Sequence, residues 1–132
     1  MASALSLFES CPGQNVLLDA AEFRILAVSD GYLKLTLRTR DALLGKRLID
    51  AFPDDPADPE QCGTANLLAS FARVKATLRK DEMGVQRHPI LDPVTGRLEE
   101  RYWKPVNSPV LDADGKLIFL IHSTEDITSQ IQ

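Results

Sequence analysis

The first third of the chain alternates short apolar runs with turn residues. Residues 3–10 place leucine and phenylalanine at helical spacing behind Ser3, a residue suited to an N-cap, so a short helix is expected there. Pro12 and Gly13 would end it. Residues 14–19 and 23–29 are rich in Val, Leu, Ile and Phe, which favours two neighbouring strands.

The middle of the chain has a helical pattern. Residues 30–52 predict helix in short pieces, with Asp41 as the N-cap and Gly45 as the stop of one single turn. Residues 58–61 have the order of a capping box and predict the start of a longer helix, although Gly63 favours a start one turn later. The apolar positions of this helix form one stripe: Leu67, Phe71, Val74 and Leu78.

From residue 81 onward the pattern predicts strands. Residues 83–91, 98–111 and 116–126 are the expected strands, joined by turns at 92–96 and 112–115. The order is strand–strand, helices, then three strands. This predicts an α+β domain: a five-stranded antiparallel sheet with short helices and one longer helix packed on one face, plus an N-terminal capping helix.

Alternation along the last strands separates two sheet faces. Trp103 and Asn107 share one side of their strand, and His122 and Thr124 share one side of theirs. Because the helices cover only one face, the apolar residues of the other face need a cover of their own. We therefore expect a homodimer that uses the outer face and the N-terminal helix. The residues expected at this dimer face are Leu5, Phe8, Val106, Val110, Leu117, Phe119 and Ile121.

Length and charge narrow the functional classes. The chain has 132 residues, which predicts one domain, and a formal net charge of −4, which argues against a nucleic-acid partner. No apolar run reaches the length of a membrane span, and the N-terminus lacks the features of a signal peptide, so a cytoplasmic location is expected. Cys11 and Cys62 are expected to be reduced thiols, with a disulfide as the alternative, and no metal site is expected.

Four segments carry a resemblance to a known family. Residues 23–33, 44–53 and 101–110 (RYWKPVNSPV), followed by residues 125–128 (EDIT), resemble the characteristic stretches of PAS domains, the sensory modules of bacterial histidine kinases and related signalling proteins. The predicted order of elements is also that of the PAS fold. The resemblance covers almost the whole chain, about residues 5–129.

The resemblance implies a division of the chain and a role for its end. Residues 1–12 would be the cap helix, 14–128 the PAS core and 129–132 the start of an output linker. In the family, a closing Asp-x-Thr couples the sheet to a following output helix, and Asp126 and Thr128 match it. The output domain, such as a histidine kinase, would follow in cis, and the domain itself is expected to be non-catalytic.

Cofactor signals are weak. Flavin-binding relatives carry an Asn-Cys-Arg-x-Leu sequence that is absent near Cys62, and haem-binding relatives supply a histidine from the main helix, which has none here. His122 is the one remaining candidate for a haem ligand by position, and a hydrogen-bonded core histidine is the alternative. His88 is expected to be a partly exposed strand residue.

The remaining hypothesis is a cavity between the main helix and the inner sheet face. It would take a small organic ligand, or an anionic one if Arg87 or Arg101 pointed inward. The alternative is that the side chains pack against one another and the domain serves only association between subunits. The expected lining comprises Tyr32, Leu48, Phe52, Leu67, Phe71, Val74, Arg87, Trp103, Asn107, Leu120, His122 and Thr124.

Overall fold

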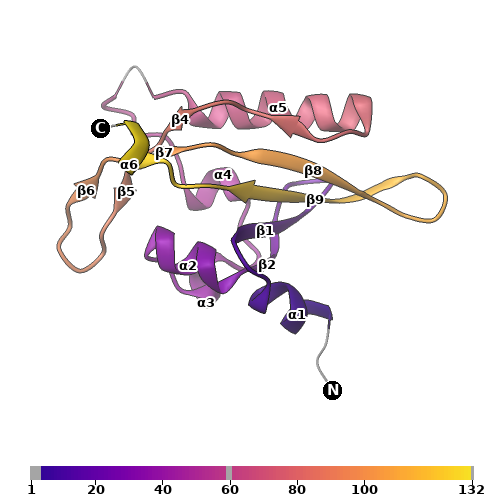
Figure 1. Cartoon of the computed structure of the whole chain (residues 1–132), viewed down its shortest axis with the longest axis horizontal. Helices are drawn as coiled ribbons and strands as arrows, with labels where there is room; N and C mark the ends of the chain where they lie inside the picture. The colour runs from indigo at the N-terminus through magenta and orange to yellow at the C-terminus, as the bar shows by residue number, and fades with distance from the viewer. Residues whose placement is uncertain (1–3, 59–60, 132) are drawn as a thin grey trace.

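The computed structural model describes residues 4–58 and 61–131 and confirms the predicted α+β fold (Figure 1). Its main sheet is antiparallel, has five strands and has the spatial order β2-β1-β9-β8-β3. The strands are β1 (Gln14–Asp19), β2 (Ile25–Val28), β3 (Asp81–Glu82), β8 (Val106–Leu111) and β9 (Leu117–Thr124). The helices are α1 (Ala4–Ser10), α2 (Asp30–Thr36), α3 (Arg40–Leu43), α4 (Leu48–Ala51), α5 (Gly63–Thr77) and α6 (Thr128–Ile131).

The centre of the sheet is a continuous ladder. β9 pairs with β1 from Gln14↔Thr124 to Asp19↔Phe119, and on its other side with β8. The inward-facing side chains of these strands pack against α2, α4 and α5 to form the core. Its fully or almost fully buried members are Val16, Leu18, Ile25, Val28, Tyr32, Leu43, Leu48, Phe71, Val74 and Leu120.

The helix boundaries refine the sequence prediction. α3 begins after Thr39, not at Asp41, which lies within its first turn. α5 begins at Gly63, one turn after the capping-box residues, and ends where Leu78 takes a left-handed conformation. Leu78 is therefore largely exposed and does not continue the buried stripe. The expected N-cap Ser3 and residues 59–60 of the capping box lie outside the described residues.

The third and fourth predicted strands are broken into short pieces. Residues 83–91 contain only β4 (Gln86–Arg87) and β5 (Ile90–Leu91), and residues 98–105 contain β6 (Leu98–Glu99) and β7 (Tyr102–Trp103). β4 pairs with β7 and β5 with β6, outside the five-stranded sheet. Gly84, with a φ of 75°, bends the chain out of the ladder, and prolines at 89 and 105 lack the N–H that a ladder requires.

The two faces of the sheet are covered differently. Figure 1 shows α5 running along the β3–β8 side, with α1 at the opposite, β2 side. An ion pair between Glu9 and Arg40 (3.0 Å) holds α1 against the helical layer. Ala27, on the outer face of β2, is buried, whereas Ile121 and Phe119 on the outer face of β9 are half-buried.

Within the described residues, no helix is both long and apolar enough to cross a membrane.

Candidate functional site

A cavity of about 90 Å³ lies between α5, the helices α2 and α4, and the broken strands. Its wall is mainly apolar, with a few polar side chains, which is the usual composition of a small-molecule site. The volume is well below the roughly 300 Å³ at which drug-sized pockets begin. The lining residues are Tyr32, Thr36, Leu48, Ile49, Phe52, Gly63, Thr64, Leu67, Met83, Gln86, His88, Ile90, Trp103, Pro105, His122 and Thr124.

Seven of the expected lining residues lie on this wall. They come from α2, α4, α5, β7, β9 and the residue that follows α4. They are Tyr32, Leu48, Phe52, Leu67, Trp103, His122 and Thr124.

Four other expected residues lie behind the wall, not on it. Phe71, Val74 and Leu120 are fully buried in the core cluster and do not line the cavity. Asn107 is also fully buried and contacts the back of His122, through its side-chain oxygen 2.7 Å from His122 Nδ1. These residues support the cavity but do not line it.

The expectation of an inward arginine is wrong. Arg87 points outward, where its guanidinium donates to both carboxylate oxygens of Glu100 and to Asp58 Oδ2 at 2.7–2.9 Å. Arg101 forms ion pairs with Glu99 and Asp126. Both arginines satisfy nearby carboxylates at the surface, so neither supplies positive charge to the cavity.

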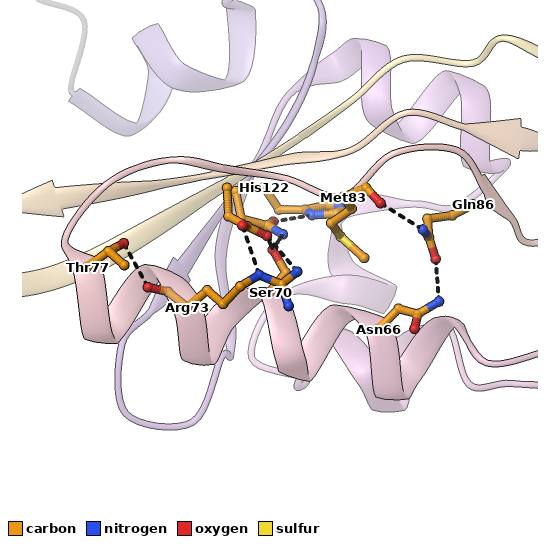
Figure 2. Close-up of polar contacts among 9 residues, drawn as sticks. Asn66, Ser70, Arg73, Thr77, Met83, Gln86 and His122 are labelled. Carbon is orange, nitrogen blue, oxygen red and sulfur yellow. Dashed lines mark hydrogen bonds and ion pairs between the residues drawn. The ribbon is translucent and has the colours of Figure 1, made fainter.

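A chain of hydrogen bonds leads from the cavity wall to the surface of α5 (Figure 2). His122 contacts Asn107, and Asn107 Nδ2 donates to Ser70 Oγ at 2.8 Å. Ser70 Oγ donates to Asp81 at 2.5 Å, and Arg73 holds the same carboxylate with two bonds of 2.9 Å. The chain therefore connects β9, β8, α5 and β3.

The titratable groups on the wall are uncharged at neutral pH. Burial lowers the pKa of His122 to about 4. Burial also lowers the pKa of His88, although Asp54 opposes that shift, and burial raises the pKa of Tyr32 despite the nearby Arg38. His88 is half-buried, with its ring edge toward Phe52. The cavity thus offers hydrogen-bonding groups without charge.

Trp103 connects the cavity to the end of the chain. Its indole N–H donates to the His88 carbonyl at 2.9 Å, and its backbone pairs with Gln86 on β4 and bridges to Asp126. The neighbouring Tyr102 N–H donates to Thr128 Oγ1 (2.9 Å), and its carbonyl accepts from Ile127 N (2.8 Å). The start of α6 is therefore attached to a strand that also forms the cavity wall.

The two candidate junction residues bond to each other at this point. Asp126 Oδ1 accepts from the backbone N–H of Thr128 (3.0 Å) and from its hydroxyl (2.5 Å). The carboxylate thus caps the first turn of α6, and Thr128 in turn fixes Tyr102.

Sequence reasoning missed several wall residues. Gln86 and Met83 were assigned to a regular strand, and Gly84 and Pro89, which interrupt that strand, were the signals that could have placed them elsewhere. Ser70 lies on the buried side of α5, but its partners Asn107 and Asp81 are far away in the sequence.

Neither cysteine lies on the cavity wall. Cys11 and Cys62 are exposed and unpaired, and Cys62 precedes α5 without lining the cavity. In the described ranges, no three His, Cys, Asp or Glu side chains gather closely enough to hold a metal ion.

Comparisons with known proteins identify the fold. Residues 13–132 match the profile of a family described as PAS fold. No curated protein matches. The chain superposes on the LOV protein of Rhodobacter sphaeroides with a TM-score of 0.71 at 15% identity, covering 93% of this chain and 64%, under two thirds, of that one.

Two solved PAS domains are also similar. The PAS domain of a Colwellia psychrerythraea protein superposes with a TM-score of 0.70 at 15% identity, covering 93% of this chain and 92% of that one. The PAS domain of Bordetella pertussis BvgS gives a TM-score of 0.63 at 25% identity, covering 96% and 87%. With the profile match spanning nearly all of the sequence, the chain belongs to the PAS-fold family of sensory domains.

Proposed function

We propose that this PAS domain is a sensor that binds a small molecule in the cavity. Binding would change the structure of the cavity wall, and this change would be passed to the segment that follows α6. The observation that carries the proposal is the position of Trp103. Its side chain lines the cavity, while its backbone bridges to Asp126 in front of α6. Tyr102, the residue before Trp103, donates the hydrogen bond that holds Thr128. A displacement of the Trp103 indole would therefore reach this bond through one neighbouring residue.

The short strand pair β4–β7 is the element that would move. It holds only two residue pairs, Gln86↔Trp103 and Arg87↔Tyr102, and it lies outside the main sheet. Elements with few ladder bonds open at a lower free-energy cost than a continuous sheet. A ligand that changes the packing of Trp103 would thus shift β7 without breaking the core.

Size and composition of the cavity favour a small ligand over a cofactor of flavin size. At about 90 Å³, the cavity holds only a few non-hydrogen atoms without rearrangement. The wall lacks a paired nucleophile and base, so we propose a binding role and not catalysis. The output domain, in this proposal a histidine kinase or another signalling module, would follow α6 in cis.

The outer sheet face and α1 form the proposed dimer contact. Val106, Val110, Phe119 and Ile121 are only half-buried on the outer face, and Leu5 is 51% exposed on α1. Association of two copies would remove this apolar surface from water. A domain that pairs in this way could relay a twist of both α6 helices together.

Native mass spectrometry of three proteins tests the proposal. We expect the wild type to carry a discrete adduct that denaturation releases, on a mass of two subunits. Leu67→Phe, which extends a side chain into the cavity, should lose the adduct. Leu68→Phe, one residue along α5 and largely exposed, is the matched control and should retain it. Amide exchange at Ile127 should differ between the filled and the empty cavity.

The outcomes separate the parts of the proposal. An adduct-free wild type of two bare subunits would contradict ligand binding and favour the association module. A single-subunit mass at tens of micromolar would contradict the dimer. Equal Ile127 exchange with and without the adduct would contradict the relay through Trp103.

A further inference from the structure

The cavity wall contains polar atoms that have no protein partner. Thr124 is only 8% exposed, and its Oγ1 is buried without a hydrogen bond from any described residue. Leaving a buried hydroxyl unpaired is destabilising, so it needs an explanation. Two other wall groups do have partners: Thr36 donates to the Tyr32 carbonyl and the Trp103 indole to that of His88.

The hydrogen-bond chain behind the wall has a fixed direction. Asp81 is ionised, because the bonds from Arg73 and then Ser70 lower the pKa of its carboxyl, so it only accepts. The Ser70 hydroxyl has one proton and donates it to Asp81. Ser70 Oγ must therefore accept from Asn107, which fixes the Asn107 amide with Nδ2 toward Ser70.

This direction determines the tautomer of His122. With Nδ2 on Ser70, Asn107 presents its oxygen to His122 Nδ1 at 2.7 Å, so Nδ1 must carry the proton. The ring is neutral, because burial keeps its pKa near 4. Nε2 then has a lone pair and accepts hydrogen bonds. The half-buried carboxylate of Asp81 on β3 thus sets the polarity of His122 on the cavity wall.

The wall carries no ionised side chain. None of its lining residues is Lys, Arg, Asp or Glu, and both of its histidines have a lowered pKa. A charged ligand would lose its hydration without gaining a counter-charge, which is strongly unfavourable. An anion would also face the Nε2 lone pair directly.

We propose that the cavity selects a small uncharged molecule that donates an O–H or N–H to His122 Nε2 and hydrogen-bonds Thr124 Oγ1, with its apolar part against Leu67 and Trp103. The inference rests on the proposed ligand-binding function and specifies its ligand class. It replaces the anionic ligand suggested by the sequence.

Three probes of similar size test the selectivity. Pyrrole has an N–H donor on an apolar ring, furan has the same shape without the donor, and propionate is an anion. Titrations of the ¹⁵N-labelled protein, followed through the amides of His122 and Thr124, should give pyrrole an affinity at least about 5-fold above that of furan. Propionate should leave these amides unshifted.

The same samples test the donor–acceptor direction of the hydrogen-bond chain from Asp81 to His122. The ¹⁵N shifts of the His122 ring should show a protonated Nδ1 and a free Nε2. Ser70→Ala removes the acceptor that orients Asn107, so the preference for pyrrole over furan should fall toward unity. Ser108→Ala, on the opposite face of the strand that carries Asn107, is the control and should retain the preference.

Each outcome decides a distinct claim. If furan or propionate binds as tightly as pyrrole, or if the proton lies on Nε2, the ligand-class inference is overturned while ligand binding stands. If no probe shifts the cavity amides, the ligand-binding function itself fails, and the inference fails with it.

Discussion

The centre of the sheet and its β3 edge differ in how regularly their strands pair. Around β1, β9 and β8 the ladder is continuous and the inward residues Val16, Leu18 and Leu120 have no exposed surface. On the other side of β8 in space, residues 81–103 form only the two-residue strands β3 to β7. The cavity lies on this second side, against Met83, Gln86 and Trp103.

The difference shows why a cavity forms where it does. A continuous ladder aligns alternate side chains so that they interdigitate with the helices and leave no space. Gly84 and Pro105 interrupt the ladder, so the side chains between them cannot align in this way. The continuous ladder supplies the support, and the interrupted segment, which lies outside that ladder, forms the cavity wall and contacts α6.

The largest expected effect compares one substitution in the two regions. Leu120→Ala, in the continuous ladder, should lower the free energy of unfolding by about 2–5 kcal/mol, because it opens a void in a fully packed core. Leu67→Ala, on the cavity wall, should cost less than half as much, because that side chain already borders open space. Urea unfolding at fixed pH measures both values.

Equal losses in the two variants would contradict the distinction between a packed support and a compliant wall. The slope of each urea transition should match that of the wild type. A changed slope would show that the substitution altered the unfolded ensemble and not only the packing.

The sequence pattern predicted the continuous ladder more accurately than the interrupted segment that forms the cavity wall. Residues 14–19 and 116–126 were predicted as strands from their content of Val, Leu, Ile and Phe, and the structure confirms them as β1 and β9. The pieces β4 and β7 could not be predicted as separate from the sheet, because their local propensity is that of ordinary strand. Whether a strand joins the main ladder depends on tertiary pairing, which the sequence pattern does not encode.

The second prediction concerns pH and uses the histidine on the continuous side. His122 has a pKa of about 4 in the folded protein against 6.5 in the unfolded chain. Between these values the unfolded state binds more protons, so the free energy of unfolding should fall as the pH drops from 6.5 to 4. The loss is about 3 kcal/mol at most. His122→Asn retains a donor for Asn107 but does not titrate, so its stability should vary less over this window.

The histidine on the interrupted side provides the internal control. His88 also has a lowered pKa, but Asp54 opposes the shift, and the residue is present in both proteins, so its contribution cancels in the comparison. Asp81 and Glu100 also have lowered pKa values, and the loss of stability from Glu100 begins within this window, but both residues are present in both proteins, so their contributions cancel as well. Parallel stability curves for wild type and His122→Asn would contradict a buried, neutral His122.

The direction of some side chains of the candidate site could be predicted from the sequence, and that of others could not. The strand parity of residues 120–124 placed His122 and Thr124 inward, because parity is local. The sequence left open whether Arg87 or Arg101 points inward, and the two-residue strand that carries Arg87 lies outside the sheet. Its direction is set by Glu100 and Asp58, whose positions follow from the turns around them.

The smallest expected effect tests this correction. Arg87→Gln removes two ion pairs at the surface, where solvent screens the charges, so neither the midpoint of urea unfolding nor the affinity for pyrrole or propionate should change measurably. Leu67→Phe, which extends a side chain into the cavity, is the positive control and should weaken pyrrole binding. If Arg87→Gln instead abolished a measurable affinity for propionate, the guanidinium would have to reach the cavity. The interrupted side of the sheet would then supply charge as well as mobility to the site.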